Sequence, residues 1–328
     1  MQQTPNYREE RTSASQNLSK NLIVSETHQE GSNRDVQQQG SPQTHQDQPW
    51  TVLRMLQWAT PYFEQRTIPS PRASIEWLLA SLLSIRRLDL YLQYDRPLST
   101  EELDTLRPMI RRRARHEPMQ YITGEAYFMD LTLRVNSDVL IPRQETEQLV
   151  ELILQQTTRQ ANDPLHVLDL GTGSGCIPIA LKKQRPHWQI FGADISNAAL
   201  NVATENAQLH QTDIHFFQAD LLQPSTLAIR PWDLIISNPP YIPPHDMPTL
   251  EPQVRDYEPH LALFHEDPLH IADRIFELCT NHHARLFMEC NDQFSDLHRE
   301  RANKMGLNLS AAKDLDNRNR FLFSTVSG

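Results

Sequence analysis

The segment His166-Val-Leu-Asp-Leu-Gly-Thr-Gly-Ser-Gly175 decides the fold of this chain. Its first five residues are mostly aliphatic, as in a strand that is buried in a parallel sheet. Three glycines at alternate positions follow at once, and they let the backbone turn sharply and approach a ligand before a helix begins near Ile177. A nicotinamide dinucleotide site favours G-x-G-x-x-G, whereas the position three after Gly173 is Cys176. The segment therefore predicts a different nucleotide-like ligand.

Apolar strands alternate with helical stretches on the carboxyl side of this segment. We expect these strands at Gln189–Ala193, Ile214–Gln218, Trp232–Ser237, Leu286–Cys290 and Phe321–Thr325. Such alternation is typical of an open, mostly parallel sheet with helices on both faces. Residues 141–328 are therefore predicted to form one doubly wound, Rossmann-like α/β domain.

The amino-terminal part of the chain divides into three segments. Residues 1–48 are rich in Gln, Ser, Thr, Asn and His, so we predict a disordered polar tail; a transit peptide fits less well because acidic residues recur there. Residues 49–118 have helical apolar spacing and predict a small helical domain. Residues 119–140 contain two short alternating segments, Met119–Ile122 and Leu131–Val135, and predict a β-hairpin that links the domains.

Four arginines lie between Arg111 and Arg115, at the end of the last predicted helix of the helical domain. They have two interpretations. Cations at a helix carboxyl terminus complement the helix dipole and are often simply solvated. The same run could dock a protein partner, and the helical domain is then a substrate-docking domain.

Composition excludes several classes of protein. The net charge of -10 over 328 residues argues against a protein that lives on nucleic acid, which would need an excess of Lys and Arg. The three cysteines are widely spaced, so a disulfide framework or zinc site is not expected and a cytoplasmic location fits best. No apolar run approaches the ~18 residues of a membrane span.

Acidic residues end three successive predicted strands, at Asp169, Asp194 and Asp220. Asp194 lies 19 residues beyond Gly175, where a carboxylate can accept hydrogen bonds from both hydroxyls of a ribose. Asp220 can accept from an adenine amino group while Leu221 lies against the ring. One such acid would fit a helix cap or turn equally well, but three in succession point to a nucleoside site.

The segment Ser237-Asn-Pro-Pro-Tyr241 follows the fourth of these strands. Two prolines fix their own φ angles and restrict the residue before them, so Asn238 is held in a stiff loop. Its carboxamide oxygen and a proline carbonyl can accept both hydrogens of a planar NH2 group. Tyr241 is expected to pack flat against that group. The segment predicts a site that presents an amino or amide nitrogen to an electrophile.

Together these features resemble the class I methyltransferases that use S-adenosylmethionine. The resemblance implies that the glycine turn borders the methionine and ribose of the cofactor. It also implies that Asp194 binds the ribose, that Asp220 and Leu221 bind the adenine, and that no metal is needed. The residues implied to bind the cofactor are Gly171, Thr172, Gly173, Ser174, Gly175, Asp194, Asp220, Leu221 and Asn238. The implied catalytic residues are Asn238, Pro239, Pro240 and Tyr241.

Flanking blocks narrow the resemblance to the HemK/PrmC family. The blocks are Arg115–Gly124, Val139–Glu147, Tyr257–Pro259, and Glu289 with Gln293. The resemblance covers roughly residues 52–326 and implies methylation of the N5 amide of the glutamine in the Gly-Gly-Gln loop of peptide chain release factors. Three segments, Phe264–Pro268, Cys290–Asp292 and Asp314–Arg320, lack glycines that the family carries.

Two other functions remain open at this point. A nucleic-acid amino-methyltransferase, acting on DNA adenine or cytosine or on ribosomal RNA guanine, shares the Asn-Pro-Pro-Tyr motif, although no basic cleft is evident. A methyltransferase fold without turnover could serve as an adaptor that binds S-adenosylmethionine. We expect no membrane partner and no sequence-specific nucleic acid partner; the oligomeric state is open, with a monomer favoured.

Overall fold

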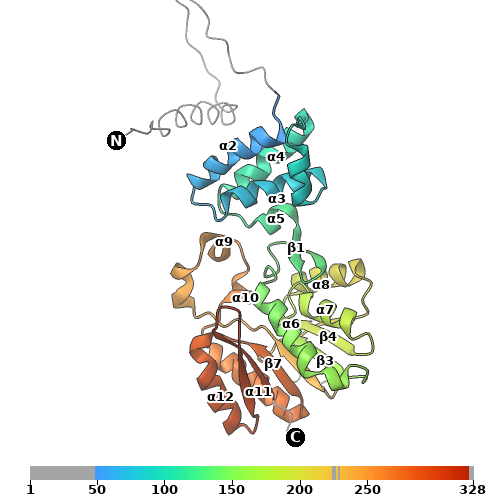
Figure 1. Ribbon diagram of the computed structural model, residues 1–328. Coiled ribbons are helices and arrows are strands. Elements are labelled where there is room, and N and C mark those ends of the chain that lie inside the picture. Colours follow the sequence, from blue (N-terminus) through green and yellow to red (C-terminus); the bar gives the residue numbers. More distant parts are fainter. Residues whose placement is uncertain (1–48, 224–226, 228–229, 325–328) are drawn as a thin grey trace, which may run out of the picture. The chain divides into compact units, whose positions relative to one another are not determined.

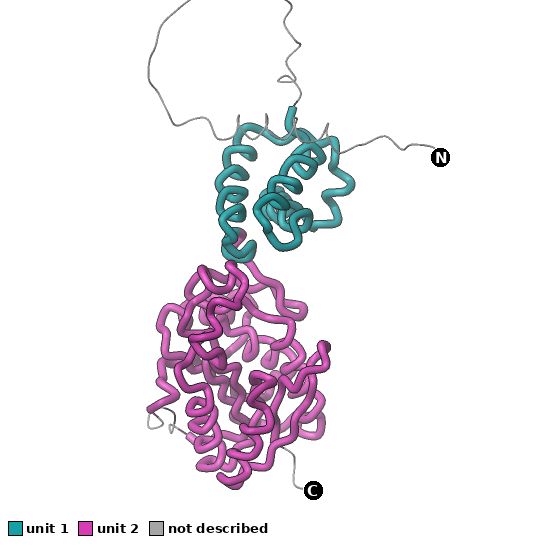
Figure 2. Tube along the Cα trace, turned by 90° about the vertical axis from the view of Figure 1, so that its left-hand side faces the viewer, with its two compact units in different colours: residues 1–122 teal, residues 123–328 magenta. Residues whose placement is uncertain are grey.

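The computed structural model describes residues 49–223, 227 and 230–324, so the tail predicted for residues 1–48 lies outside the described residues. The chain divides into two compact units after Ile122, as Figure 2 shows. The division falls inside the segment 119–140 that the sequence assigned to a linking hairpin.

The first unit is a small helical bundle around an apolar core that includes Phe63, Leu78 and Leu106. Its helices are α2 Val52–Glu64, α3 Pro71–Leu83, the 3-10 helix η1 Arg87–Gln93, α4 Thr100–Arg113 and the short α5 Met119–Thr123. Helix α4 begins with a capping box, in which the Ser99 hydroxyl accepts from the Glu102 N–H and the Glu102 carboxylate accepts from the Ser99 N–H.

The arginine run at the end of α4 has a structural role within this unit. Arg113 is buried, and its guanidinium donates to the Ser74 hydroxyl at 3.1 Å and to the Glu117 carbonyl at 2.9 Å. Arg112 forms an ion pair with the Glu117 carboxylate at 2.6 Å. The prediction of a docking patch is therefore wrong for Arg113, whereas Arg111 and Arg115 are exposed.

The strand predicted for Met119–Ile122 is wrong, because these residues form α5. The backbone N–H groups of Tyr121 and Ile122 both donate to the Pro118 carbonyl, so Pro118 opens a helical turn. The hairpin begins later, with β1 Glu125–Phe128 paired antiparallel to β2 Leu131–Arg134. Its buried side chains, which include Phe128 and Leu133, join the core of the second unit.

The second unit contains a seven-stranded sheet in the order β5-β4-β3-β6-β7-β9-β8. The strands are β3 His166–Leu170, β4 Gln189–Asp194, β5 His215–Gln218, β6 Leu234–Ser237, β7 Arg285–Glu289, β8 Leu309–Lys313 and β9 Asn319–Ser324. The first five in spatial order are parallel, and β9 runs antiparallel to both β7 and β8. The predicted α/β fold with a mostly parallel sheet is confirmed.

Helices cover both faces of this sheet, as Figure 1 shows. Side chains alternate along the strands, so Val167 and Ile236 pack on one face with α6 Gln144–Gln156 and α7 Cys176–Gln184. Leu168 and Ile235 pack on the other face with α11 Pro268–His282 and α12 Ser295–Lys304. The remaining elements are η2 Thr158–Gln160, α8 Asn197–Leu209, η4 Pro244–Thr249, α9 Pro252–Arg255, α10 His260–Leu263 and η5 Asp292–Phe294.

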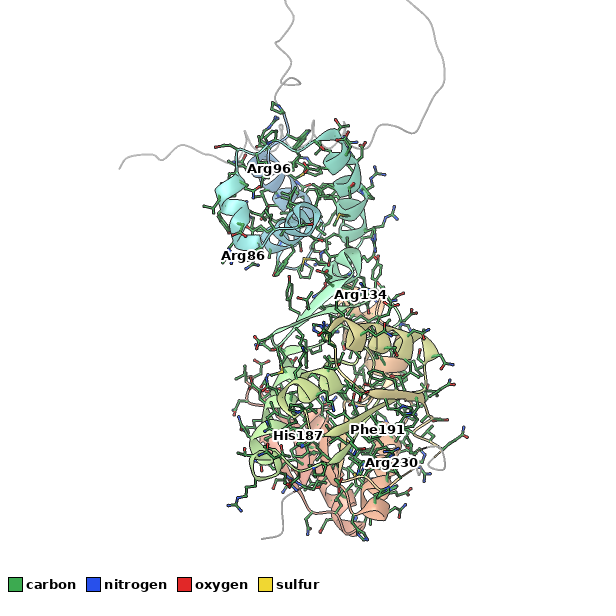
Figure 3. The ribbon with its side chains drawn as sticks, turned by 90° about the vertical axis from the view of Figure 1, so that its right-hand side faces the viewer. Arg86, Arg96, Arg134, His187, Phe191 and Arg230 are labelled. Carbon is green, nitrogen blue, oxygen red and sulfur yellow. The ribbon has the colours of Figure 1, made fainter. Side chains whose placement is uncertain are left out.

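An aromatic cluster fixes the segment that leads into β6. The Arg230 guanidinium carbon lies 4.2 Å from the centroid of the Phe191 ring on β4 (Figure 3). Trp232 meets the same ring edge-on, with centroids 5.2 Å apart, and donates its indole N–H to the Leu227 carbonyl at 3.0 Å. These contacts hold the start of β6 near its partner strands.

No helix in the described ranges has both the length and the apolar character that a membrane crossing requires.

Candidate active site

A cavity of about 340 Å³ lies where the strands β3, β4 and β6 end. Because neighbouring parallel strands end at the same edge of a sheet, the loops that follow them converge there. The predicted residues that line the cavity are Gly171, Thr172, Gly173, Ser174, Asp194, Asp220, Leu221, Asn238, Pro239 and Pro240. Two predicted residues, Gly175 and Tyr241, are described by the structure but are not among its lining residues.

The glycine turn is pinned to the end of β4. The N–H groups of Gly171 and Thr172 both donate to the Ala193 carbonyl, at 2.8 and 3.0 Å. An added Cβ at Gly173 would meet nothing within 4 Å, so this position faces open space. The turn therefore presents bare backbone to the cavity, as expected of a site that a ligand approaches closely.

Gly175 has a structural role in the turn. It precedes α7, and its φ of +79° lies in the left-handed region. A Cβ there would lie 3.2 Å from the Ala203 Cβ on α8. Gly175 therefore lets the start of α7 approach α8 closely, and its predicted role in cofactor binding remains a prediction.

Asp194 connects the glycine turn with α8. One carboxylate oxygen accepts from the Gly173 N–H and the other from the Ser196 N–H, both at 2.9 Å. Burial raises the pKa of this carboxyl, while these backbone hydrogen bonds lower it. Each oxygen retains further acceptor capacity toward the cavity. Asp194 can thus hold the turn and a ligand hydroxyl at the same time.

Asp220 organises the loop after β5. It accepts from the Leu222 N–H at 2.9 Å and from the Gln223 side chain at 3.1 Å. Together with Leu221 it lines the cavity beside Ile195. This wall combines a carboxylate with apolar side chains, which suits a flat ring that carries an amino group.

Asp169 is buried beneath the turn, and neither of its oxygens has a hydrogen-bond partner within the described residues. Burial and, to a smaller extent, the nearby charge of Asp194 raise its pKa to about 7, against the lowering effect of the neighbouring Thr172 hydroxyl. Orphaned buried carboxylates are rare in native proteins, and one beside a ligand cavity indicates a site that favours positive charge.

Asn238 stands on the cavity wall with its amide NH2 already engaged. Its Nδ2 donates to the Thr146 hydroxyl oxygen at 3.1 Å, and the Thr146 hydroxyl donates to the Glu289 carboxylate at 2.9 Å. Tyr241 donates its hydroxyl to the other oxygen of Glu289 at 3.0 Å. The structure therefore brings Asn238 and Tyr241 together through two residues that the sequence did not assign to the site.

A buried ion pair supports another part of the cavity wall. Arg143 lies 2.5 Å from the carboxylate of Glu258, whose side chain is only 1% exposed. Glu258 also accepts from the Ile141 N–H at 3.2 Å. It thereby fixes the segment before α6, of which Ile141, Pro142 and Arg143 line the cavity.

Two further residues that the sequence analysis missed shape the turn. Asn206 is fully buried on α8 and donates to the carbonyls of Ser174 and Arg134, while its own carbonyl accepts from the Arg134 N–H. Gly192 leaves room for the turn, since a Cβ there would lie 2.6 Å from the Phe216 ring and 2.9 Å from the Thr172 hydroxyl. A buried Asn within an apolar helix face is the signal that would have drawn attention to Asn206.

The residues of the cavity fit S-adenosylmethionine. Its volume is within the range of small-molecule sites, roughly 300–1,000 Å³. Bare backbone at Gly173, the carboxylates of Asp194 and Asp220 and the apolar wall around Leu221 match a ligand with a ribose and an adenine. Throughout the described ranges, no group of three or more His, Cys, Asp or Glu side chains is placed to hold a metal ion.

Comparison with known proteins gives two family models and many relatives. Residues 54–124 match the PrmC N-terminal domain, and residues 144–250 match the methyltransferase small domain. A release factor glutamine methyltransferase of Geobacter sulfurreducens is 42% identical over 220 residues, which are 67% of this chain and 75% of that protein. A release factor glutamine methyltransferase of Chlorobaculum tepidum is 42% identical over 221 residues, which are 65% of this chain and 75% of that protein. A methyltransferase structure from Pyrococcus furiosus aligns over 60% of this chain and 89% of that chain, with 11% identity and a TM-score of 0.42.

Proposed function

The chain belongs to the release factor glutamine methyltransferase family, and on this premise we propose that it methylates the N5 amide of the glutamine in the Gly-Gly-Gln loop of peptide chain release factors. Its methyl donor is S-adenosylmethionine. The observation that carries the proposal is the placement of Asn238 on the wall of the cavity that the glycine turn also borders.

The cofactor-binding residues are part of the proposal. Gly171, Thr172, Gly173 and Ser174 would lie along the methionine and ribose, and Asp194 would accept from the ribose hydroxyls. Asp220 would accept from the adenine amino group, with Leu221 against the ring. Bound S-adenosylmethionine supplies a sulfonium methyl group, which is electrophilic without further activation.

The chain's own residues align the attacking nitrogen. A carboxamide nitrogen is a poor nucleophile because its lone pair is delocalised into the carbonyl group. The Asn238 side-chain oxygen and a carbonyl of Pro239 or Pro240 would accept both hydrogens of the substrate amide. These two hydrogen bonds would fix the plane of the NH2 group and direct its lone pair toward the methyl carbon. As the nitrogen forms its bond to the methyl carbon, the bond from that carbon to the sulfonium sulfur would break and leave its electron pair on sulfur, and one amide proton then leaves to solvent.

The rival activities have less support. A nucleic-acid amino-methyltransferase would need a basic cleft, whereas the net charge is -10 and the cavity carries Asp194 and Asp220. An inactive adaptor would not need Asn238 to face an open cavity. We further propose a monomer in the cytoplasm, where the three buried free thiols would stay reduced.

Mass spectrometry tests the proposal. A purified release factor is incubated with this protein and S-adenosylmethionine, and its peptides are examined for one added methyl group. The expected result is methylation of the Gly-Gly-Gln glutamine and no methylation when that glutamine is replaced by Ala. If the methyl group of the cofactor is found in RNA or DNA instead, the proposal is wrong and the protein is a nucleic-acid methyltransferase. Cofactor binding without any transfer would favour the adaptor.

A further inference from the structure

Four side chains form one continuous chain of hydrogen bonds, which begins at the cavity wall with Asn238 and Thr146. It runs from the Asn238 amide to the Thr146 hydroxyl on α6, from there to the Glu289 carboxylate at the end of β7, and ends at the Tyr241 hydroxyl. Three separate elements thus meet at one carboxylate. Thr146 is 3% exposed and Glu289 is 1% exposed, so protein groups determine the hydrogen bonding here.

The direction of this chain follows from the chemistry of its members. The single hydroxyl proton of Thr146 is donated to one oxygen of Glu289, while Tyr241 donates to the other. The Thr146 oxygen can then only accept from Asn238. If the Asn238 amide were reversed, its oxygen would lie against the Thr146 oxygen with no proton between them. One buried hydrogen bond would then be lost.

The surroundings of Glu289 bear on its ionisation. Burial is the largest influence and, with the charge of Glu145, raises the pKa of Glu289, although the hydrogen bonds from Thr146 and Tyr241 and the charge of Arg320 lower it in part. Arg320 is held in place by Asp314, which its Nε reaches at 3.2 Å, and by the Cys290 carbonyl, also at 3.2 Å. Each oxygen of Glu289 accepts one hydrogen bond, one from Thr146 and the other from Tyr241, and is fixed in place by it.

We propose that Glu289 and Thr146 are positioning residues that fix the amide orientation of Asn238. The NH2 group of Asn238 is turned toward the protein, so its oxygen faces the cavity as an acceptor for the substrate amide. This inference rests on the proposed function, because it deepens the role given there to Asn238. Tyr241 contributes from the opposite side by anchoring the second oxygen of Glu289.

Thr146→Val tests the inference, since it removes the hydroxyl at nearly constant volume. We expect kcat for release factor methylation to fall about tenfold to hundredfold, as for a misaligned reactant, while the Kd for S-adenosylmethionine stays unchanged. Thr146→Ser keeps the hydroxyl and should restore most of kcat. Glu289→Gln, whose amide can donate to Thr146 and so allow the reversed Asn238 orientation, should lower kcat at least as far.

Thr157→Val is the matched control. Thr157 is the equally buried residue that ends α6, and its hydroxyl donates to the Ile153 carbonyl at 2.6 Å, remote from the chain of hydrogen bonds. This variant should keep the wild-type kcat. Wild-type kcat in Thr146→Val, or an equal loss in Thr157→Val, would overturn the inference and leave the proposed function intact.

A spectroscopic measurement separates the inference from the proposed function. In protein labelled with 15N at asparagine, the Asn238 side-chain NH2 protons should show a nuclear Overhauser effect to the Thr146 side chain, lost in Glu289→Gln. This contact requires no substrate. If it is present while the wild-type protein methylates no release factor, only the proposed function fails; if it is missing in the wild-type protein, the inference fails.

Discussion

The carboxylate of Asp194 accepts a hydrogen bond from the backbone N–H of Gly173 at 2.9 Å, although the two residues belong to different strand–loop units. The same side chain lines the cavity. Asp194 therefore contributes twice, by shaping the turn and by offering acceptor capacity to a ligand.

Replacing Asp194 by Ala should weaken the binding of the cofactor more than it slows methyl transfer. The loss of an acceptor and of the bond that holds Gly173 should raise the Kd for S-adenosylmethionine more than about tenfold, which corresponds to about 1.4 kcal/mol. Isothermal titration calorimetry measures this. At saturating cofactor, kcat should recover much of its wild-type value. An unchanged Kd would contradict the role of Asp194.

Asn238→Ala should have the opposite pattern. The variant removes the acceptor for the substrate NH2, so transfer to a release factor should fall by about 10²–10³, the usual cost of one lost alignment group. The Kd for S-adenosylmethionine should stay close to wild type. Single-turnover rates with saturating cofactor give the comparison, and wild-type rates would defeat the assignment.

Arg143→Met should destabilise the second unit. It leaves the Glu258 carboxylate buried and unpaired, which typically costs about 3–5 kcal/mol of unfolding free energy. The double variant Arg143→Met with Glu258→Leu should recover part of that loss. The control is Lys304→Met, which breaks an exposed ion pair with Glu300 and should leave the free energy of unfolding nearly unchanged. Urea unfolding decides between these outcomes.

Asp169→Asn should change the pH dependence of stability. The folded wild-type protein holds a proton on Asp169 up to a pKa of about 7, whereas the ordinary pKa of an Asp side chain is 3.8. Between these values the folded state binds more protons than the unfolded state. The wild-type free energy of unfolding should therefore fall with rising pH relative to the variant, by about 1.4 kcal/mol per pH unit.

Unfolding curves of both proteins between about pH 4.5 and pH 8, a range that covers most of the roughly 4–7 window of this linkage and extends beyond its upper end, give the test. His298, whose pKa burial lowers to about 4, changes stability in the opposite direction, but it is present in both proteins and cancels in the difference. The difference should grow up to about pH 7 and then level off. A constant difference across the range would show that Asp169 titrates normally.

Much of the fold and of the cavity wall could be predicted because the relevant signals are local. The alternation of strands and helices, the glycine turn and the acids at Asp194 and Asp220 each lie within a few residues of a strand end. Parallel topology then brings those ends together without further information. The cavity accordingly contains most of the predicted residues.

The supporting residues could not be predicted because their partners are distant in the sequence. Asn206 bonds to Arg134 and Ser174, and Thr146 bonds to Glu289, across separations of 72, 32 and 143 residues. Nothing within a single sequence links such positions. Strand β8 was missed for a different reason, since its sequence Leu-Ser-Ala-Ala-Lys has no run of β-branched or aromatic residues and lies at the sheet edge.

The place of β9 between β7 and β8 has a consequence for how the protein is made. Among the described strands, β8 pairs only with β9, which is synthesised after it. While a ribosome is still translating β9, β8 can pack against α12 but has no strand to pair with, and the flank of β7 stays open. Strand pairing in this half of the sheet must therefore wait for the emergence of Ser324, and Arg320, whose charge acts on Glu289, arrives in the same final step.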